Sequence, residues 1–181
     1  MTSSSTYKYG QALILLHWLM FFLFIFVYAA IEFRVFFDKG MPEREFMKAL
    51  HFMFGILVLL LVLLRLVARR LSPRLPPDSS KGWSKFFHIG SQAAHWALYA
   101  FMLGMPLMGW MVLSAAGKPI PFFGLVMPAL MGPDEVLSKQ LKSLHETVGS
   151  IGYVLIGLHV LAAFFHQFVL KDHLMARMRL R

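Results

Sequence analysis

The chain has 181 residues, a net charge of +9 and a mean hydropathy of +0.63, and 58% of its residues are hydrophobic. This composition is too apolar for a soluble domain of this size, so it predicts a membrane protein, and we expect no nucleic-acid partner. The chain has no cysteine, which excludes thiolate-bound iron–sulfur clusters, disulfides and covalent haem attachment within it.

Four apolar stretches follow one another along the chain, and each is long enough to cross a bilayer as one helix. We expect these helices at about 12–33, 47–70, 86–115 and 144–170. The first stretch exceeds the apolar core of a usual signal peptide, so we interpret it as a retained helix. The sequence therefore predicts an all-α integral membrane four-helix bundle that forms a single transmembrane domain over residues 1–181.

The distribution of Lys and Arg near the helix ends predicts how the bundle lies in the membrane. If the N-terminus is inside, the inner segments hold eleven bases and two acids, whereas the outer segments hold seven of each. By the positive-inside rule, both termini are expected in the cytoplasm. The polar, proline-rich linker at 71–85 is then an inner surface loop. The longer loop at 117–142 is expected on the outer surface, where its apolar middle forms a lid.

Histidines occur at two depths in the predicted helices. His51 and His145 fall in the outer half of the membrane, and His17 and His159 fall in the inner half. His145 and His159 are fourteen residues apart on one helix, so their rings project from nearly the same face, about 21 Å apart along the axis. Intramembrane histidines are costly to bury and usually functional. Two levels of histidine suggest two b-type haems that move electrons across the bilayer.

The residues alone determine the ligands of an outer haem more firmly than those of an inner one. No other histidine shares the depth of His51 and His145, so an outer bis-histidine haem would have to use both. At the inner level His159 has three possible partners, which are His17, His88 and His95. A lone histidine could simply pack between helices, but two at each of two depths favour ligation. Four glycines could make room for a macrocycle or for close helix contact, namely Gly55, Gly149, Gly152 and Gly157.

Four segments carry a resemblance to a known family, and together they cover nearly the whole chain in order. They are LLHWL at His17, IEFRVFF at Arg34, the segment from His51 to Arg65, and LHETVGSIGYVLIGLHVLAAFFHQFVLKD. At these residues the chain resembles the prokaryotic diheme cytochrome b-561 family of the bacterial inner (cytoplasmic) membrane, in particular its superoxide oxidase type. The resemblance implies that His17 and His159 ligate the iron of an inner haem b, and that His51 and His145 ligate an outer one.

The same resemblance implies the function. Superoxide would give electrons at the periplasmic face, and ubiquinone would collect them near the cytoplasmic face, with no obligate protein partner. The expected quinone contacts are His166, Lys81 and Trp18, although the linker that contains Lys81 differs in composition from the family's version. His166 lies seven residues after His159, where it could bond a quinone carbonyl and deliver a proton.

Arg34 is the residue we expect to guide superoxide, because it directly follows the first helix. It is one of seven outer bases, which are Arg34, Lys39, Arg44, Lys48, Lys118, Lys139 and Lys142. Seven acids cancel this charge overall, namely Glu32, Asp38, Glu43, Glu45, Asp134, Glu135 and Glu146. Electrostatic steering would therefore require the bases to line an opening and the acids to face away from it.

Other functions are compatible with the pattern. The protein could be a membrane anchor that relays electrons between quinone and a periplasmic redox protein. In a different class, intramembrane histidines could serve a metal or proton transporter, or the chain could be a purely structural subunit. A visible spectrum separates these classes, because a colourless purified protein would contain no haem.

Overall fold

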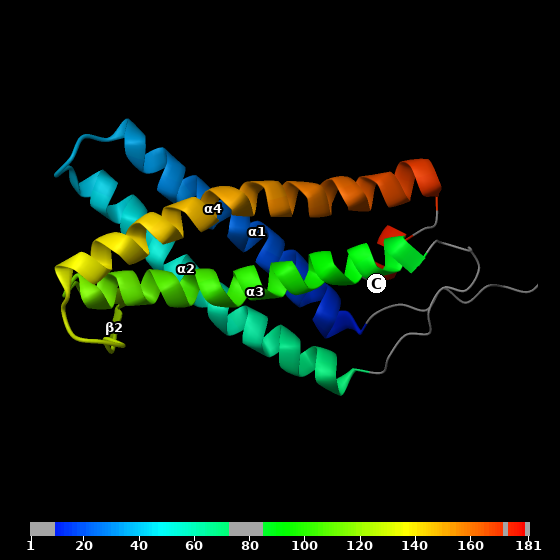
Figure 1. Cartoon of the computed structure of the whole chain (residues 1–181), viewed down its shortest axis with the longest axis horizontal. Helices are drawn as coiled ribbons and strands as arrows, with labels where there is room; N and C mark the ends of the chain where they lie inside the picture. The colour runs from blue at the N-terminus through cyan, green and yellow to red at the C-terminus, as the bar shows by residue number, and fades with distance from the viewer. Residues whose placement is uncertain (1–9, 73–84, 172–173, 180–181) are drawn as a thin grey trace, which may run out of the picture.

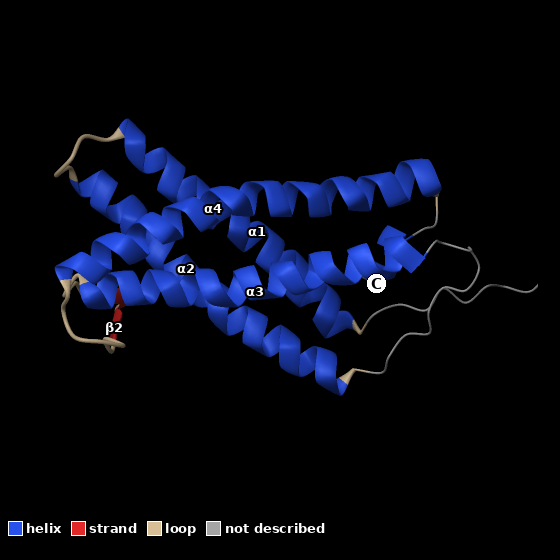
Figure 2. Cartoon of the chain, in the orientation of Figure 1, coloured by secondary structure: helices blue, strands red, loops and turns tan. Residues whose placement is uncertain are grey.

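A computed structural model of the chain describes residues 10–72, 85–171 and 174–179. In order, the elements are α1 (Gln11–Phe33), η1 (Arg34–Phe36), α2 (Pro42–Leu71), α3 (Lys85–Ala115), β1 (Ile120–Phe122), β2 (Leu125–Met127), α4 (Glu135–Phe164), η2 (Phe165–Leu170) and η3 (Leu174–Met178). Four long helices dominate the molecule (Figures 1 and 2), and the expected all-α bundle is confirmed.

The helices are arranged as two antiparallel pairs. α1 packs on α2, α3 packs on α4, and the pairs meet where α2 contacts α3. Figure 1 shows that α1 begins at the same end of the bundle as α4 finishes. We call this end the terminal end. The opposite end, which carries η1 and the β1–β2 strands, is called the hairpin end.

The surface of the bundle suits lipid rather than water. All four helices are long and apolar enough to cross a membrane, and large apolar side chains such as Phe26, Leu64 and Val154 remain more than half exposed. A cluster that includes Met20 and Val62 packs α1, α2 and α3 together. By contrast, α4 buries only Gly152 among its described residues. α4 therefore stands off from part of the bundle, which leaves room inside.

Two helices begin earlier than the hydropathy predicts. α2 begins at Pro42 rather than near 47, and α4 begins at Glu135 rather than near 144. Proline occupies the first turn of α2, where its missing N–H costs nothing. The Asp134 side chain accepts a hydrogen bond of 2.9 Å from the backbone N–H of Leu137 and so caps α4. These added turns are polar, and a search for apolar spans ends before them.

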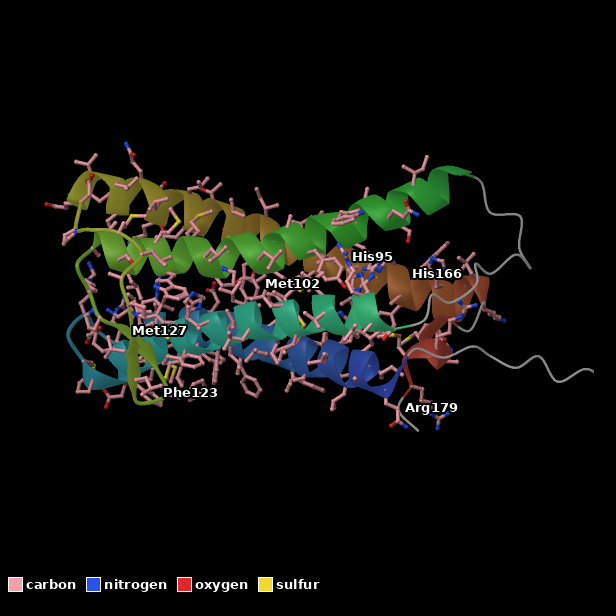
Figure 3. The ribbon with its side chains drawn as sticks, turned by 90° about the horizontal axis from the view of Figure 1, so that it is seen from below. His95, Met102, Phe123, Met127, His166 and Arg179 are labelled. Carbon is pink, nitrogen blue, oxygen red and sulfur yellow. The ribbon has the colours of Figure 1, made fainter. Side chains whose placement is uncertain are left out.

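The loop expected to form a lid contains a small β-hairpin. β1 pairs with β2 through a turn at Phe123 and Gly124, both of which have positive φ. The Phe123 N–H contacts the Met53 sulfur at 3.3 Å, and the Trp110 indole N–H donates to the Pro128 carbonyl at 2.9 Å. The segment therefore rests on α2 and α3 and covers part of the hairpin end (Figure 3).

Candidate functional site

At the hairpin end, two histidines face each other across the bundle. The ring centroids of His51 on α2 and His145 on α4 are 6.1 Å apart, with an interplanar angle of 84°. Two metal–imidazole bonds of about 2 Å, plus the distance of about 1 Å from nitrogen to centroid in each ring, give about 6 Å. The spacing therefore fits one metal ion held between the two imidazoles.

The hydrogen bond of His51 defines which nitrogen can bind a metal. His51 Nδ1 lies 3.0 Å from the backbone carbonyl oxygen of Val27 on α1. A carbonyl can only accept, so Nδ1 carries the proton and Nε2 keeps its lone pair. Ligating histidines commonly donate their other N–H to a carbonyl in this way. His145 differs, because its Nδ1 is buried without a hydrogen-bond partner.

A cavity of about 1020 Å³ lies beside this pair. Gly55, Gly109 and Gly149 line it, and the absence of side chains there widens it. Two of the glycines considered from the sequence behave differently. A Cβ on Gly152 would overlap Phe101 and Tyr28, which makes it a site of close helix contact, whereas Gly157 has no neighbouring side chain within 4 Å of such an atom. The cavity can hold a flat macrocycle between the two imidazoles.

The inner level contains three histidines instead of two. The centroid of His159 on α4 lies 6.2 Å from that of His17 on α1 and 5.7 Å from that of His95 on α3. His95 Nδ1 lies 2.6 Å from the Ser91 carbonyl oxygen, one turn earlier on its own helix. The side chain of His88 lies outside the described residues. Of the three candidate partners of His159, the structure therefore brings two to it, His17 and His95.

Comparison with known proteins identifies the family. The family model of the prokaryotic cytochrome b561 matches residues 8–179. The chain is 34% identical to a "Probable superoxide oxidase CybB" from Yersinia pestis, over 94% of this chain and 95% of that relative. It is 31% identical to "Cytochrome b561 homolog 1" from Escherichia coli strain K12, over 94% of this chain and 96% of the relative.

The chain belongs to the prokaryotic cytochrome b561 family. Membership makes it a multi-pass bacterial membrane protein that binds haem b and takes part in electron transfer. The two levels of facing imidazoles fit this chemistry, because a six-coordinate haem passes electrons without an open iron position.

Basic side chains of the cytochrome gather beside the inner histidines. Arg65 on α2 donates a hydrogen bond of 2.7 Å to the carbonyl of Leu13, one turn before His17. The guanidinium of Arg69 lies 5.5 Å from the centroid of the Tyr99 ring. Arg65 is therefore partly buried in the bundle at the terminal end, whereas Arg69 is exposed at the same level. Anionic haem propionates at this level would meet positive charge there.

The cavity of the cytochrome is lined by far more bases than acids. Six of the seven outer bases line it, and only Lys139 does not. Three of the seven acids line it, namely Glu32, Glu45 and Glu146. The outer segments therefore carry no net charge as a whole, whereas the lining of the cavity carries a net positive charge. The bases line the cavity as electrostatic steering requires, and four of the seven acids lie outside its lining.

Three of the six lining bases, Lys48, Lys142 and Arg44, have partners, whereas one nitrogen of Arg34 has none. Lys48 pairs with Glu45 at 2.5 Å, and Lys142 pairs with Glu146 at 3.6 Å. The Nε atom of Arg34 is buried without a hydrogen-bond partner. A buried guanidinium nitrogen without a partner is costly, and an anion bound at Arg34 would lower that cost.

Two of the three residues expected at a quinone site, His166 and Trp18, lie at the terminal end. His166 lies on η2, a π-helix that follows α4, and π-helical turns occur often at functional sites. The indole N–H of Trp18 donates to the carbonyl of Met178 on η3 at 3.0 Å, so that N–H is already engaged. Lys81 lies outside the described residues. Figure 3 shows His166 nearer the terminal end than His95.

Two tyrosines that the sequence did not single out lie beside the cavity. The Tyr153 hydroxyl donates to Glu32 at 2.7 Å, and the Tyr28 hydroxyl donates to the Gly149 carbonyl at 2.9 Å. The two rings lie 4.3 Å apart and tie α1 to α4 beside the cavity. Their spacing from the histidines on each helix was visible in the sequence, but only packing shows that they meet.

Proposed function

We propose that this cytochrome holds two haems b and oxidises superoxide with ubiquinone as the electron acceptor. The hairpin end would face the periplasm and the terminal end the cytoplasm, in the bacterial inner membrane. Two superoxide anions would each lose one electron and leave as oxygen. One ubiquinone would take up those two electrons with two protons and become ubiquinol.

The ligands follow from the two levels of imidazole. His51 and His145 would hold the outer haem, because their rings face each other at the spacing of a bis-histidine site. His17 and His159 would hold the inner haem, and their separation of 6.2 Å nearly equals that of the outer pair. His95 lies closer to His159, at 5.7 Å, but it is exposed, and for that reason we assign the ligand role to His17. When bound, each haem would supply a one-electron carrier of fixed coordination.

The observation that carries the proposal is the enrichment of bases around the cavity beside the outer pair. Six bases against three acids give the lining a net positive charge that favours a small anion. Arg34 would hold superoxide there through its unpartnered Nε. The name of the Yersinia relative, probable superoxide oxidase, agrees with this substrate.

The terminal end supports reduction of a quinone. His166 would donate a hydrogen bond and then a proton to a carbonyl oxygen of the quinone. Trp18 would line the site with its ring while its N–H holds η3 in place. Lys81 would contribute a further cation from the linker.

A pulse-radiolysis experiment tests the substrate. Superoxide generated by a pulse should reduce the purified, oxidised cytochrome at a second-order rate that falls as salt is added. Arg34→Gln should lower this rate by roughly threefold to tenfold at low salt, because it removes one positive charge and the unpartnered Nε from the lining.

Lys139→Gln is the matched control, since Lys139 carries the same charge but pairs with Glu135 outside the cavity. Its rate should stay within about twofold of the parent. No reduction of the parent by superoxide, or equal slowing in both variants, would refute the proposal.

A further inference from the structure

His145, a proposed haem ligand, lies against the backbone of α3 at Gly109, which has no side chain. An ideal Cβ placed on Gly109 would lie 3.2 Å from Cε1 of His145 and 3.7 Å from its Nδ1. A separation of 3.2 Å is tighter than an ordinary van der Waals contact. The missing side chain at Gly109 is therefore what allows the imidazole to approach α3 this closely.

The backbone beneath that contact offers a hydrogen-bond acceptor. In a helix, the side chain of a residue covers the turn that precedes it, so a side chain at 109 would shield the carbonyl of Met105. Met105 lines the same cavity as His145 and Gly109. Nδ1 of His145 is buried without a formed hydrogen bond. A carbonyl oxygen has two lone pairs, so Met105 can accept from Nδ1–H while it still serves its own helix.

His51, the other proposed ligand of the outer haem, already makes a hydrogen bond of this kind. His51 on α2 donates from Nδ1 to the carbonyl of Val27 on the neighbouring helix α1. His145 on α4 faces the carbonyl of Met105 on its own neighbouring helix, α3. The two helix pairs would therefore hold the outer haem in equivalent ways, each ligand being oriented by a backbone carbonyl of its partner helix.

We infer that Gly109 is a positioning residue, which leaves the Met105 carbonyl open so that Nδ1–H of His145 donates to it when His145 binds iron. This inference rests on the proposed haem site at His51 and His145. Donation from Nδ1 makes the imidazole more basic and stabilises the ferric state. Loss of the hydrogen bond should therefore raise the reduction potential of the outer haem without affecting the inner one.

The test compares Gly109→Ala with Gly104→Ala in the haem-loaded protein. Gly104 lies on the same helix, and a Cβ there would meet nothing within 4 Å. Redox titration followed by absorption and low-temperature EPR should show a higher potential and altered g values for the outer haem in Gly109→Ala only. The inner haem serves as an internal reference, because its unchanged signal shows that the variant has folded.

A second readout applies to the parent protein. In the reduced, diamagnetic state, the Nδ1 proton of His145 should appear at the low field typical of a hydrogen-bonded imidazole N–H, and Gly109→Ala should move it upfield. Selective loss of the outer haem in Gly109→Ala would also support the inference, provided that Gly104→Ala retains both haems.

Two results would overturn the inference, and they are distinguishable. If the parent binds two haems and the two alanine variants show the same outer potential and g values, Gly109 has no positioning role, while the proposed function stands. If the parent binds no haem at His145, as shown by an unchanged haem content in His145→Ala, the proposed site fails and the inference falls with it.

Discussion

At the scale of single residues, the hydrogen bond from His51 Nδ1 to the Val27 carbonyl sets the orientation of that imidazole. The sequence predicted the depth of each histidine, because depth depends only on spacing along a helix. It could not predict that Val27 orients His51, since that contact depends on how α1 is rotated about its axis. It also left three possible partners for His159, and two of these reach it in the structure.

Removal of single histidines separates those two partners. His17→Ala should lose the inner haem, because the remaining imidazole of His159 lacks its partner at 6.2 Å. His95→Ala should keep both haems and change the inner one only slightly. Haem content and the low-temperature α-band of each variant provide the measurement. Loss of the inner haem in His95→Ala, with retention in His17→Ala, would reverse the assignment.

At the scale of the elements, one face of α4 carries both the two histidines and the small residues between them. It presents His145 and His159 to the interior, and between them its small residues admit neighbouring side chains. Hydropathy predicted that this helix crosses the membrane, but it could not locate its polar first turns or the π-helix that carries His166. The sequence left the roles of its glycines open, and only packing separates them.

Two glycines of α4 should respond in opposite ways to alanine. In Gly152→Ala the new methyl group would overlap Phe101 and Tyr28, which should lower the free energy of unfolding by about 1–3 kcal/mol. In Gly157→Ala the methyl group enters open space, and the change should be neutral or stabilising by up to about 1 kcal/mol. Thermal unfolding in detergent measures both. Equal stability of the two variants would show that the contact at Gly152 is not tight.

At the scale of the whole molecule, two helix pairs enclose a cavity whose lining holds six bases and three acids. The sequence predicted the bundle because four long apolar spans allow few alternatives. The sequence could not predict which charged residues line the cavity, because the outer bases and acids alternate along the chain and are separated only in the folded structure. The orientation in the membrane still rests on the positive-inside rule.

Labelling with a membrane-impermeant maleimide tests the orientation, because the chain has no native cysteine. Lys139→Cys places an exposed thiol at the hairpin end, and Arg70→Cys places one at the terminal end. In intact spheroplasts, the thiol at 139 should react, whereas the thiol at 70 should react only after lysis. The reverse pattern would place the superoxide cavity in the cytoplasm.

The ratio of haem to protein tests the central claim most directly. The parent, produced with ample haem and purified folded in detergent, should contain two haems b per chain. They should titrate as two one-electron components, and one component should disappear in His51→Ala and in His145→Ala. A parent that binds one haem or none under these conditions would contradict an electron path built on two levels of paired histidines.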